Sequence, residues 1–314
     1  MSRYILRRMR HAVLVLWAAF TVSFAVLFVV PGDPVTMGLG TEQLQSLTPE
    51  QIDELRAQAG TDRPFYVQYV DQLWNALHGD LGHSYRNGVA VTRTLADAAP
   101  STLELAASAL VLGVVLGVAL AITATLTRSA WLRELLVSLP PLGVSLPSFW
   151  IGLVLLQVFS FQLGWFPAFG ERGLSGLVLP AITLSIPVAA ITSQVLIKSL
   201  TTTLAEPYSD VLRAKGVGRF RIFFRHALRN ASLPALTTVG VTVATLLGGS
   251  VLTETVFSRN GLGQIAATAV GQKDIPVVMG VVLVSAVVFV VVSLAIDLLY
   301  SALDPRVRIE GARA

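Results

Sequence analysis

The chain of 314 residues contains no cysteine and few charged residues. Without cysteine it can form neither a disulfide nor a zinc–thiolate site, and it has no thiol nucleophile. Charged residues make up 13% of the chain, against roughly 25% in a typical soluble domain. The hydrophobic share of 54% and the mean hydropathy of +0.68 match that shortage. The composition therefore indicates a membrane protein.

Lysine and histidine are also scarce, and their positions exclude two common kinds of site. None of the three lysines, Lys198, Lys215 and Lys273, follows a glycine, so the chain has no nucleotide-binding loop of the G-x-x-x-x-G-K-[ST] type. The four histidines are too scattered to suggest a metal site, and no H-E-x-x-H motif occurs. We therefore expect no cofactor, no metal site and no enzymatic activity in this chain.

Six apolar stretches are near or above the ~20 residues that a bilayer requires. They are residues 12–30, 105–126, 135–161, 177–197, 232–252 and 275–299. The sequence thus predicts an all-α, polytopic membrane protein with six transmembrane helices. The third stretch contains Pro140, Pro141 and Pro147, so we expect it to begin late or to be kinked.

These stretches hold almost no ionisable residue at mid-depth. Glu104, Lys198, Glu254 and Asp297 lie near their ends. Ion-coupled carriers usually place carboxylates or histidines within the membrane for the coupling ion. The pattern favours a conduit that receives its energy from elsewhere. An ion-coupled secondary carrier stays an alternative, because backbone carbonyls can also bind ions.

The basic residues predict the topology. With the N-terminus inside, sixteen of the 23 lysines and arginines fall in cytoplasmic segments and seven fall outside. Because cytoplasmic loops of membrane proteins carry the excess of Lys and Arg, both termini are predicted to be cytoplasmic. The same clustering at the ends of apolar stretches explains the net charge of +4 and the pI of about 9.7 without a nucleic-acid partner.

The segment between the first two spans is predicted to be extracytoplasmic and helical. Thr48, Pro49 and Gln51 form an N-cap with a capping box, and Gly60 ends that helix. A second helix follows Pro64, ends at Gly79 and places its large apolar residues on one face: Tyr66, Tyr69, Val70, Leu73, Trp74 and Leu77. The segment is either a cap on the spans or a docking surface for something delivered from outside, and the two interpretations are compatible.

Residues 206–216, between the fourth and fifth spans, carry helix signals at both ends. Pro207 suits the first position of a helix. Asp210 lies near its start, and Arg213 and Lys215 lie in its last turn, which complements the helix dipole. Gly216 can adopt the left-handed conformation that ends a helix. A helix this short cannot span a bilayer, so we expect it at the membrane surface, available to a soluble partner.

A second amphipathic helix is predicted after Gly218. Its aromatic stripe comprises Phe220, Phe223, Phe224, Ala227 and Leu228, opposite Arg221, Arg225 and Arg229. This pattern is typical of a helix in the membrane interface. The alternative is a basic anchor that leads into the fifth span at Pro234.

Short motifs are spread in order over nearly the whole chain. They are P-G-D-P at 31–34, L-T-P-E-Q at 47–51, D-R-P at 62–64, G-D-L-G at 79–82, R-A-K-G at 213–216, H-A-L-R-N at 226–230, E-T-V-F-S at 254–258, G-L-G at 261–263 and D-P-R at 304–306. In their order and spacing the chain resembles the permease subunits of binding-protein-dependent ABC importers of the dipeptide/oligopeptide/nickel type. Two departures are that Val211 and Leu212 replace the alanines of the family's E-A-A-x-x-x-G pattern, and that Arg259 and Asn260 stand where tryptophan and proline are frequent.

The resemblance implies a type I ABC importer transmembrane fold and a role for residues 206–216 as the coupling helix. Its ATPase-contacting residues would be Asp210, Arg213, Ala214, Lys215 and Gly216. ATP would be bound by cytoplasmic ABC ATPase subunits and not by this chain. A second homologous permease and an extracytoplasmic solute-binding protein are the other implied partners.

The resemblance also implies an organisation, a location and a substrate class. Residues 1–99 would form the first span and the extracytoplasmic segment, residues 100–303 the five-helix core, and residues 304–314 a cytoplasmic tail. The location would be the bacterial plasma (inner) membrane. Short peptides are the expected substrates, with nickel, glutathione or another small solute as alternatives.

Overall fold

The computed structural model describes residues 2–29, 36, 45–169 and 173–303. These residues are almost entirely helical, and the β-type pairing among them is one isolated bridge between His83 and Ala90. The all-α prediction is therefore confirmed. The P-G-D-P motif at 31–34 and the predicted tail at 304–314 lie outside the described residues.

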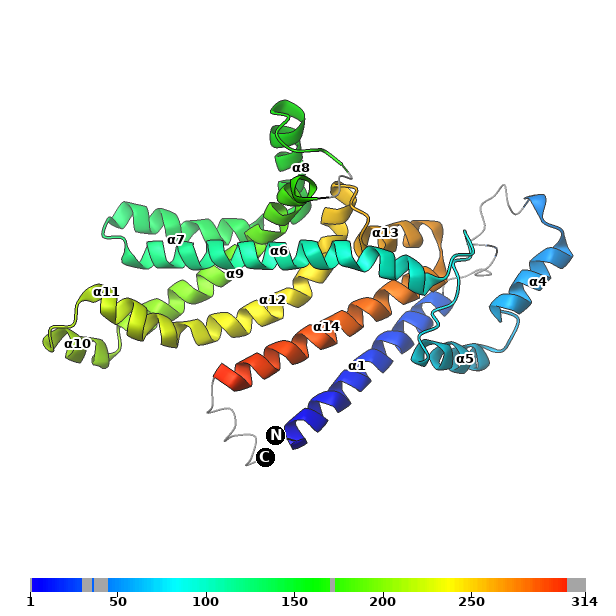
Figure 1. The fold of residues 1–314 in the computed structure, drawn as a ribbon, viewed down its shortest axis with the longest axis horizontal. Coiled ribbons are helices and arrows are strands. Elements are labelled where there is room, and N and C mark those ends of the chain that lie inside the picture. Colours follow the sequence, from blue (N-terminus) through cyan, green and yellow to red (C-terminus); the bar gives the residue numbers. More distant parts are fainter. Residues whose placement is uncertain (1, 30–35, 37–44, 170–172, 304–314) are drawn as a thin grey trace. The chain divides into compact units, whose positions relative to one another are not determined.

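The chain forms two compact units, which we treat separately. The first draws on residues up to Thr102 and on Asn260–Leu294. Its elements are α1 (Ser2–Val29), α4 (Pro49–Ala59), α5 (Phe65–Leu77), the start of α6 (Val91–Leu126), α13 (Leu262–Gln272) and most of α14 (Ile275–Leu303) (Figure 1). One core joins α6, α13 and α14 and contains Val91, Leu95, Ala98, Leu262, Ala269, Val277 and Val281. The first unit is thus held together by side chains from both ends of the sequence.

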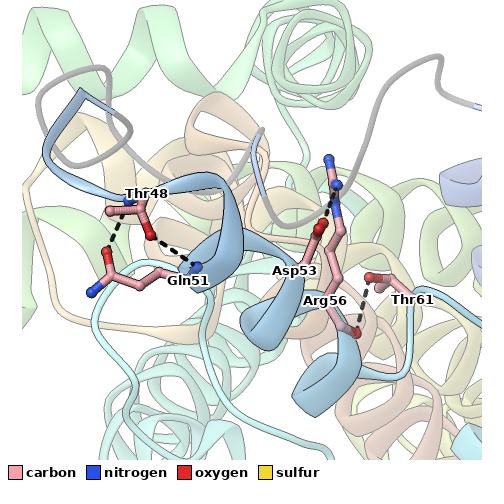
Figure 2. A network of polar contacts seen from close by, with 5 residues as sticks. All are labelled: Thr48, Gln51, Asp53, Arg56 and Thr61. Atoms are coloured by element: carbon pink, nitrogen blue, oxygen red, sulfur yellow. Dashed lines mark hydrogen bonds and ion pairs between the residues drawn. The ribbon is translucent and has the colours of Figure 1, made fainter.

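Helix α4 begins with the capping box that the sequence predicts (Figure 2). The Gln51 N–H donates to the Thr48 hydroxyl at 3.4 Å, and the Thr48 N–H donates to the Gln51 side chain at 2.8 Å. Hydrogen bonds from its own backbone N–H and from Thr48 hold the pKa of the exposed Glu50 carboxyl below its ordinary value. Gly60, at φ 66°, ends the helix. Both predicted ends of α4 are confirmed.

Helix α5 carries the predicted apolar residues in two different environments. Tyr69 and Leu73 pack against a cluster formed by Phe20 and Phe24 of α1 and Met279 of α14. The remaining four large apolar residues, Tyr66, Val70, Trp74 and Leu77, are exposed. The predicted apolar face of α5 is therefore wider than the part of α5 that packs on α1 and α14.

The second unit covers Leu103–Arg259 and the end of α14. Its elements are the rest of α6, α7 (Ala130–Ser145), α8 (Ser148–Leu155), η1 (Leu156–Gln162), α9 (Leu174–Leu204), α10 (Pro207–Ala214), α11 (Arg219–Arg221), η2 (Ile222–Ala227) and α12 (Leu228–Val256) (Figure 1). Helix α9 packs against α7, α8 and α12. It also packs against α6, where Gly113 and Gly117 allow a close approach: a Cβ added to Gly117 would lie 2.7 Å from the carbonyl oxygen of Ala189. Helix α9 is therefore the centre of this unit.

Four described helices, α1, α6, α9 and α14, are each long and apolar enough to cross a membrane, and counting two bent pairs as spans raises the number to six. One pair joins α7 to α8 and η1 with a bend of 102°. The bend falls where Leu146 adopts an extended conformation before Pro147, because proline disfavours the helical conformation of the residue before it. The predicted kink of the third stretch is thus confirmed at Pro147, while Pro140 and Pro141 lie within α7.

Candidate functional site

Helix α10 lies between two long membrane helices and begins abruptly. Helix α9 ends at Leu204, and Glu206 adopts an extended conformation (φ −68°, ψ 146°) that restarts the chain as α10. Pro207 occupies the first helical position, where its missing N–H breaks no hydrogen bond. The helix has only eight residues, too few to cross a bilayer.

The C-terminal end of α10 forms a complete Schellman motif. Gly216, at φ 76°, donates its N–H to the carbonyl of Arg213 at 2.9 Å. Val217 donates to the carbonyl of Leu212 at 3.0 Å. These two bonds satisfy carbonyls that a helix end would otherwise leave unpaired. The left-handed conformation predicted for Gly216 is confirmed, so the direction of the chain after α10 depends on this glycine.

Helix α10 presents one face to the protein and the other to the surroundings. Ser209 is buried, and Tyr208 and Leu212 are half-buried on the same side. The five residues predicted to contact an ATPase, Asp210, Arg213, Ala214, Lys215 and Gly216, are all exposed. Asp210 and Arg213 form an ion pair at 3.2 Å on this exposed face. The structure therefore brings the predicted residues together on one accessible surface, which we call the α10 outer face.

Val211 also belongs to the α10 outer face, with 53% of its surface exposed. It was not among the predicted contact residues. The signal that could have identified it is an apolar residue directly after the charged Asp210, on a short helix expected at the membrane surface. Exposed apolar side chains ringed by polar ones are common where one protein docks on another.

The loop after α10 is anchored by a buried cluster. Ile222, Phe223 and Ala227 of η2 are nearly inaccessible. Phe223 and Ala227 belong to one core with Ala121 of α6, Leu196 and Leu200 of α9, and Ala231 and Ala235 of α12. Arg219 adds a hydrogen bond from its guanidinium to the carbonyl oxygen of Leu126, at the end of α6, at 3.2 Å. We call this set the anchor cluster; it joins the α10 loop to three long helices.

The predicted aromatic stripe of residues 220–228 is corrected by this packing. Phe220 and Phe224 are 68% and 50% exposed, whereas Phe223 and Ala227 are buried. The reason is the π-helical turn, in which hydrogen bonds join residues five apart. Ile222 and Ala227 therefore lie on the same side, which an α-helical spacing does not predict. The chain also runs from η2 directly into α12 at Leu228, so the fifth long helix begins before Pro234.

At the other end of α12, Arg259 connects three segments of the second unit. It is 8% exposed. Its guanidinium donates to the carbonyl oxygen of Gly176 at 3.0 Å and lies 3.5 Å from the Glu104 carboxylate. This arginine occupies a position where the sequence departs from the family pattern, and it links the end of α12 to α6 and to the start of α9.

The chemistry of the α10 outer face suits the binding of another protein. It offers one carboxylate, two cationic side chains and the apolar side chains of Val211 and Ala214, all on a short helix or its C-terminal cap. Among the described residues, no group of three or more His, Cys, Asp or Glu side chains could hold a metal ion.

Comparisons with protein families cover nearly the whole chain. The family described as "Binding-protein-dependent transport system inner membrane component" matches residues 113–309. The N-terminal family of the same transport systems matches residues 1–106.

Individual relatives agree with these matches. The chain is 33% identical over 308 residues to the glutathione transport system permease protein of Escherichia coli (strain K12), covering 98% of this chain and 99% of that protein. It is equally identical over 316 residues to a protein of Brucella abortus (strain 2308) named as a candidate peptide transport system permease, again with 98% and 99% coverage.

Solved structures show the same fold. An inward-facing MetNI methionine ABC transporter has a TM-score of 0.56 and 22% identity, and the match covers 67% of this chain and 96% of that chain. An amino acid ABC transporter with histidines has a TM-score of 0.52 and 16% identity, with coverage of 68% and 94%.

Proposed function

The chain belongs to the family of binding-protein-dependent transport system inner membrane components, and from this premise we propose that it imports short peptides as one permease subunit of an ABC transporter. The observation that carries the proposal is the exposed α10 outer face on its buried anchor cluster. The substrate class follows from the relatives, which are named for glutathione and for peptide transport. Glutathione is itself a tripeptide, so both names describe one chemical class.

The coupling step is a movement of α10 driven by a cytoplasmic ATPase. The α10 outer face docks on an ATPase subunit, which binds ATP; this chain has no nucleotide-binding loop of its own. Movement of α10 passes to α9 through the short link at Ala205 and Glu206. It passes to α12 and α6 through the anchor cluster. Helices α9 and α12 pack on each other, so a displacement of α10 moves both of them.

Two further partners and a topology complete the proposal. A second permease of similar fold forms the other wall of the pathway, and an external binding protein delivers the peptide. Both termini are cytoplasmic, in agreement with the excess of basic residues on that side. This orientation puts α10 on the same side of the membrane as the ATPase.

The substrate passes through apolar and hydroxyl-bearing surroundings. Five of the six apolar stretches contain no ionisable residue, and the sixth contains only Asp297. A short peptide carries a charge at each end, and such a pathway offers these charges no fixed partner. It therefore binds peptides weakly enough to release them. Selectivity then lies mainly in the external binding protein.

Uptake by a deletion strain tests the substrate class. We expect the strain lacking this chain to lose growth on di- to pentapeptides as the sole source of a required amino acid. The wild-type gene should restore growth, and the Gly216→Val variant, inserted at an equal level, should not. Undiminished peptide uptake in the deletion strain, with loss of nickel or sugar uptake instead, would contradict the peptide assignment.

A further inference from the structure

Helix α5 has an exposed apolar row that the transport function does not use. Tyr66, Val70, Trp74 and Leu77 are spaced by four, four and three residues, so they lie on one side of the helix. Their exposed fractions run from 60% to 73%. The row is next to the face of α5 that packs on α1, which makes the two faces one continuous apolar arc.

The polar side of α5 lies opposite this arc. Asp71 forms an ion pair with Arg63 at 2.8 Å. The Gln68 amide donates to the carbonyl oxygens of Thr61 and Arg63 at 3.2 and 2.7 Å. Asn75 is exposed and lies on this side too. Helix α5 is therefore amphipathic, with an apolar arc too wide for its contact with the rest of the unit.

The contact with α1 fixes the depth of α5. Tyr69 lies against the rings of Phe20 and Phe24, and its hydroxyl is 2.8 Å from that of Thr21. The apolar part of α1 that can cross a membrane is Arg8–Val26. At 1.5 Å per residue, Phe24 and Phe20 lie about 3 and 9 Å before Val26, and the apolar sequence continues beyond Val26, so both residues lie inside the span. The side of α5 that packs on α1 is therefore level with the last three turns of α1, a helix long and apolar enough to cross a membrane (Figure 1).

The side of α1 that faces away from α5 is apolar at the same depth. Val22 and Val26 are 61% and 60% exposed, although they alternate along the helix with the buried Phe20 and Phe24. The exposed row of α5 is apolar as well. Its composition fits the boundary of a bilayer, where the rings of Trp and Tyr are enriched. With 13 residues, α5 is too short to span the bilayer.

We propose that α5 is a membrane-embedded helix that lies in the leaflet around the C-terminal end of α1, with Tyr66, Val70, Trp74 and Leu77 among the lipid acyl chains. This depth matches interfacial helices, whose apolar faces lie roughly 5–10 Å inside the headgroup boundary. The segment between the first two spans is then partly embedded in the membrane and not entirely exposed to water. The inference rests on α1 as a membrane span and is independent of the transported solute.

Spin labels on introduced cysteines test the proposal, because the chain has no cysteine of its own. Single-cysteine variants Val70→Cys, Trp74→Cys and Asn75→Cys carry a nitroxide in the full transporter, reconstituted in phosphatidylcholine liposomes. Asn75 is the matched control, since it is exposed and adjacent to Trp74 but lies on the polar side. Val22→Cys reports a lipid-facing site on α1.

Collision rates with oxygen, which enters lipid, and with a water-soluble nickel chelate give the outcome. We expect the oxygen-to-nickel ratio at positions 70 and 74 to exceed that at position 75 severalfold and to approach that at position 22. Equal nickel accessibility at positions 70, 74 and 75 would place α5 in water and overturn the proposal. Low accessibility to both reagents at positions 70 and 74 would show that a protein partner covers the row, which also overturns it.

Discussion

Substituting Gly216 by serine perturbs the backbone at the end of α10 without a steric clash. A Cβ at this position would meet no atom within 4 Å, so the substitution acts through the backbone alone. The residue has φ 76°, and a left-handed conformation costs an L-residue about 1–2 kcal/mol. The two hydrogen bonds of the Schellman motif depend on that conformation.

The size of the effect follows from this strain. A cost of about 1–2 kcal/mol shifts the equilibrium between the capped and uncapped ends of α10 roughly 5- to 30-fold. If only the capped form docks on the ATPase, peptide-stimulated ATP hydrolysis and peptide uptake should both fall severalfold. Gly216→Val should lower them further, since a β-branched residue at positive φ is a conformational outlier.

Gly218→Ser is the matched control, two residues away in the same loop. Gly218 also has no atom within 4 Å of an added Cβ, but its φ is −64°. It is the N-cap of α11, a position that favours serine. The assay compares both variants in proteoliposomes that contain the ATPase subunits, the binding protein and peptide, at equal levels of membrane insertion. Wild-type activity in Gly216→Ser, or an equal loss in both variants, would refute the reasoning.

Three further predictions address the ion pair, the helix packing and the topology. Asp210→Lys should abolish transport at normal insertion, although the exposed ion pair with Arg213 is worth only about 0.3–0.5 kcal/mol. If adding Arg213→Glu, which restores an ion pair of reversed sign, fails to restore uptake, the ATPase must contact these charges directly. Gly117→Ala should lower the stability of the solubilised protein by about 1–3 kcal/mol, because its new Cβ would lie 2.7 Å from the carbonyl oxygen of Ala189. In the control Gly248→Ala the new Cβ meets no atom within 4 Å, so the melting temperature should be unchanged. Gln58→Cys should react with an impermeant thiol reagent in intact cells and Arg219→Cys should not, and the reverse labelling would overturn the topology.

Local signals in the sequence predicted both capped short helices. Thr48 with Gln51, and Gly60, mark the ends of α4, and Pro207 and Gly216 mark those of α10, because caps depend on residues within one turn. The break at Pro147 followed for the same reason. The exposure of Asp210 and Arg213 could also be predicted, since charged residues on so short a helix are seldom buried.

Features that depend on distant contacts could not be predicted in this way. The π-helical turn at η2 changes which aromatic residues are buried, and it is stabilised by packing on Leu196 and Leu200 of α9. The division of the α5 apolar residues into packed and exposed sets depends on Phe20 and Phe24, more than 40 residues earlier in the chain. The role of Arg259 required Gly176 and Glu104 to be brought beside it. The assignment of residues 1–99 and 100–303 to separate parts stays a prediction.

The central claim is that the α10 outer face contacts the ATPase, and site-specific photocrosslinking tests it most directly. The transporter is assembled in native membranes with a benzophenone amino acid in place of Val211, which is 53% exposed. In the control, the same amino acid replaces Trp165, an exposed residue on the predicted outer side. The account predicts a crosslink from position 211 to the ATPase subunit, with a yield that changes on addition of ATP, and none from position 165. Absence of an ATPase crosslink at position 211 in a complex that contains the ATPase would contradict it.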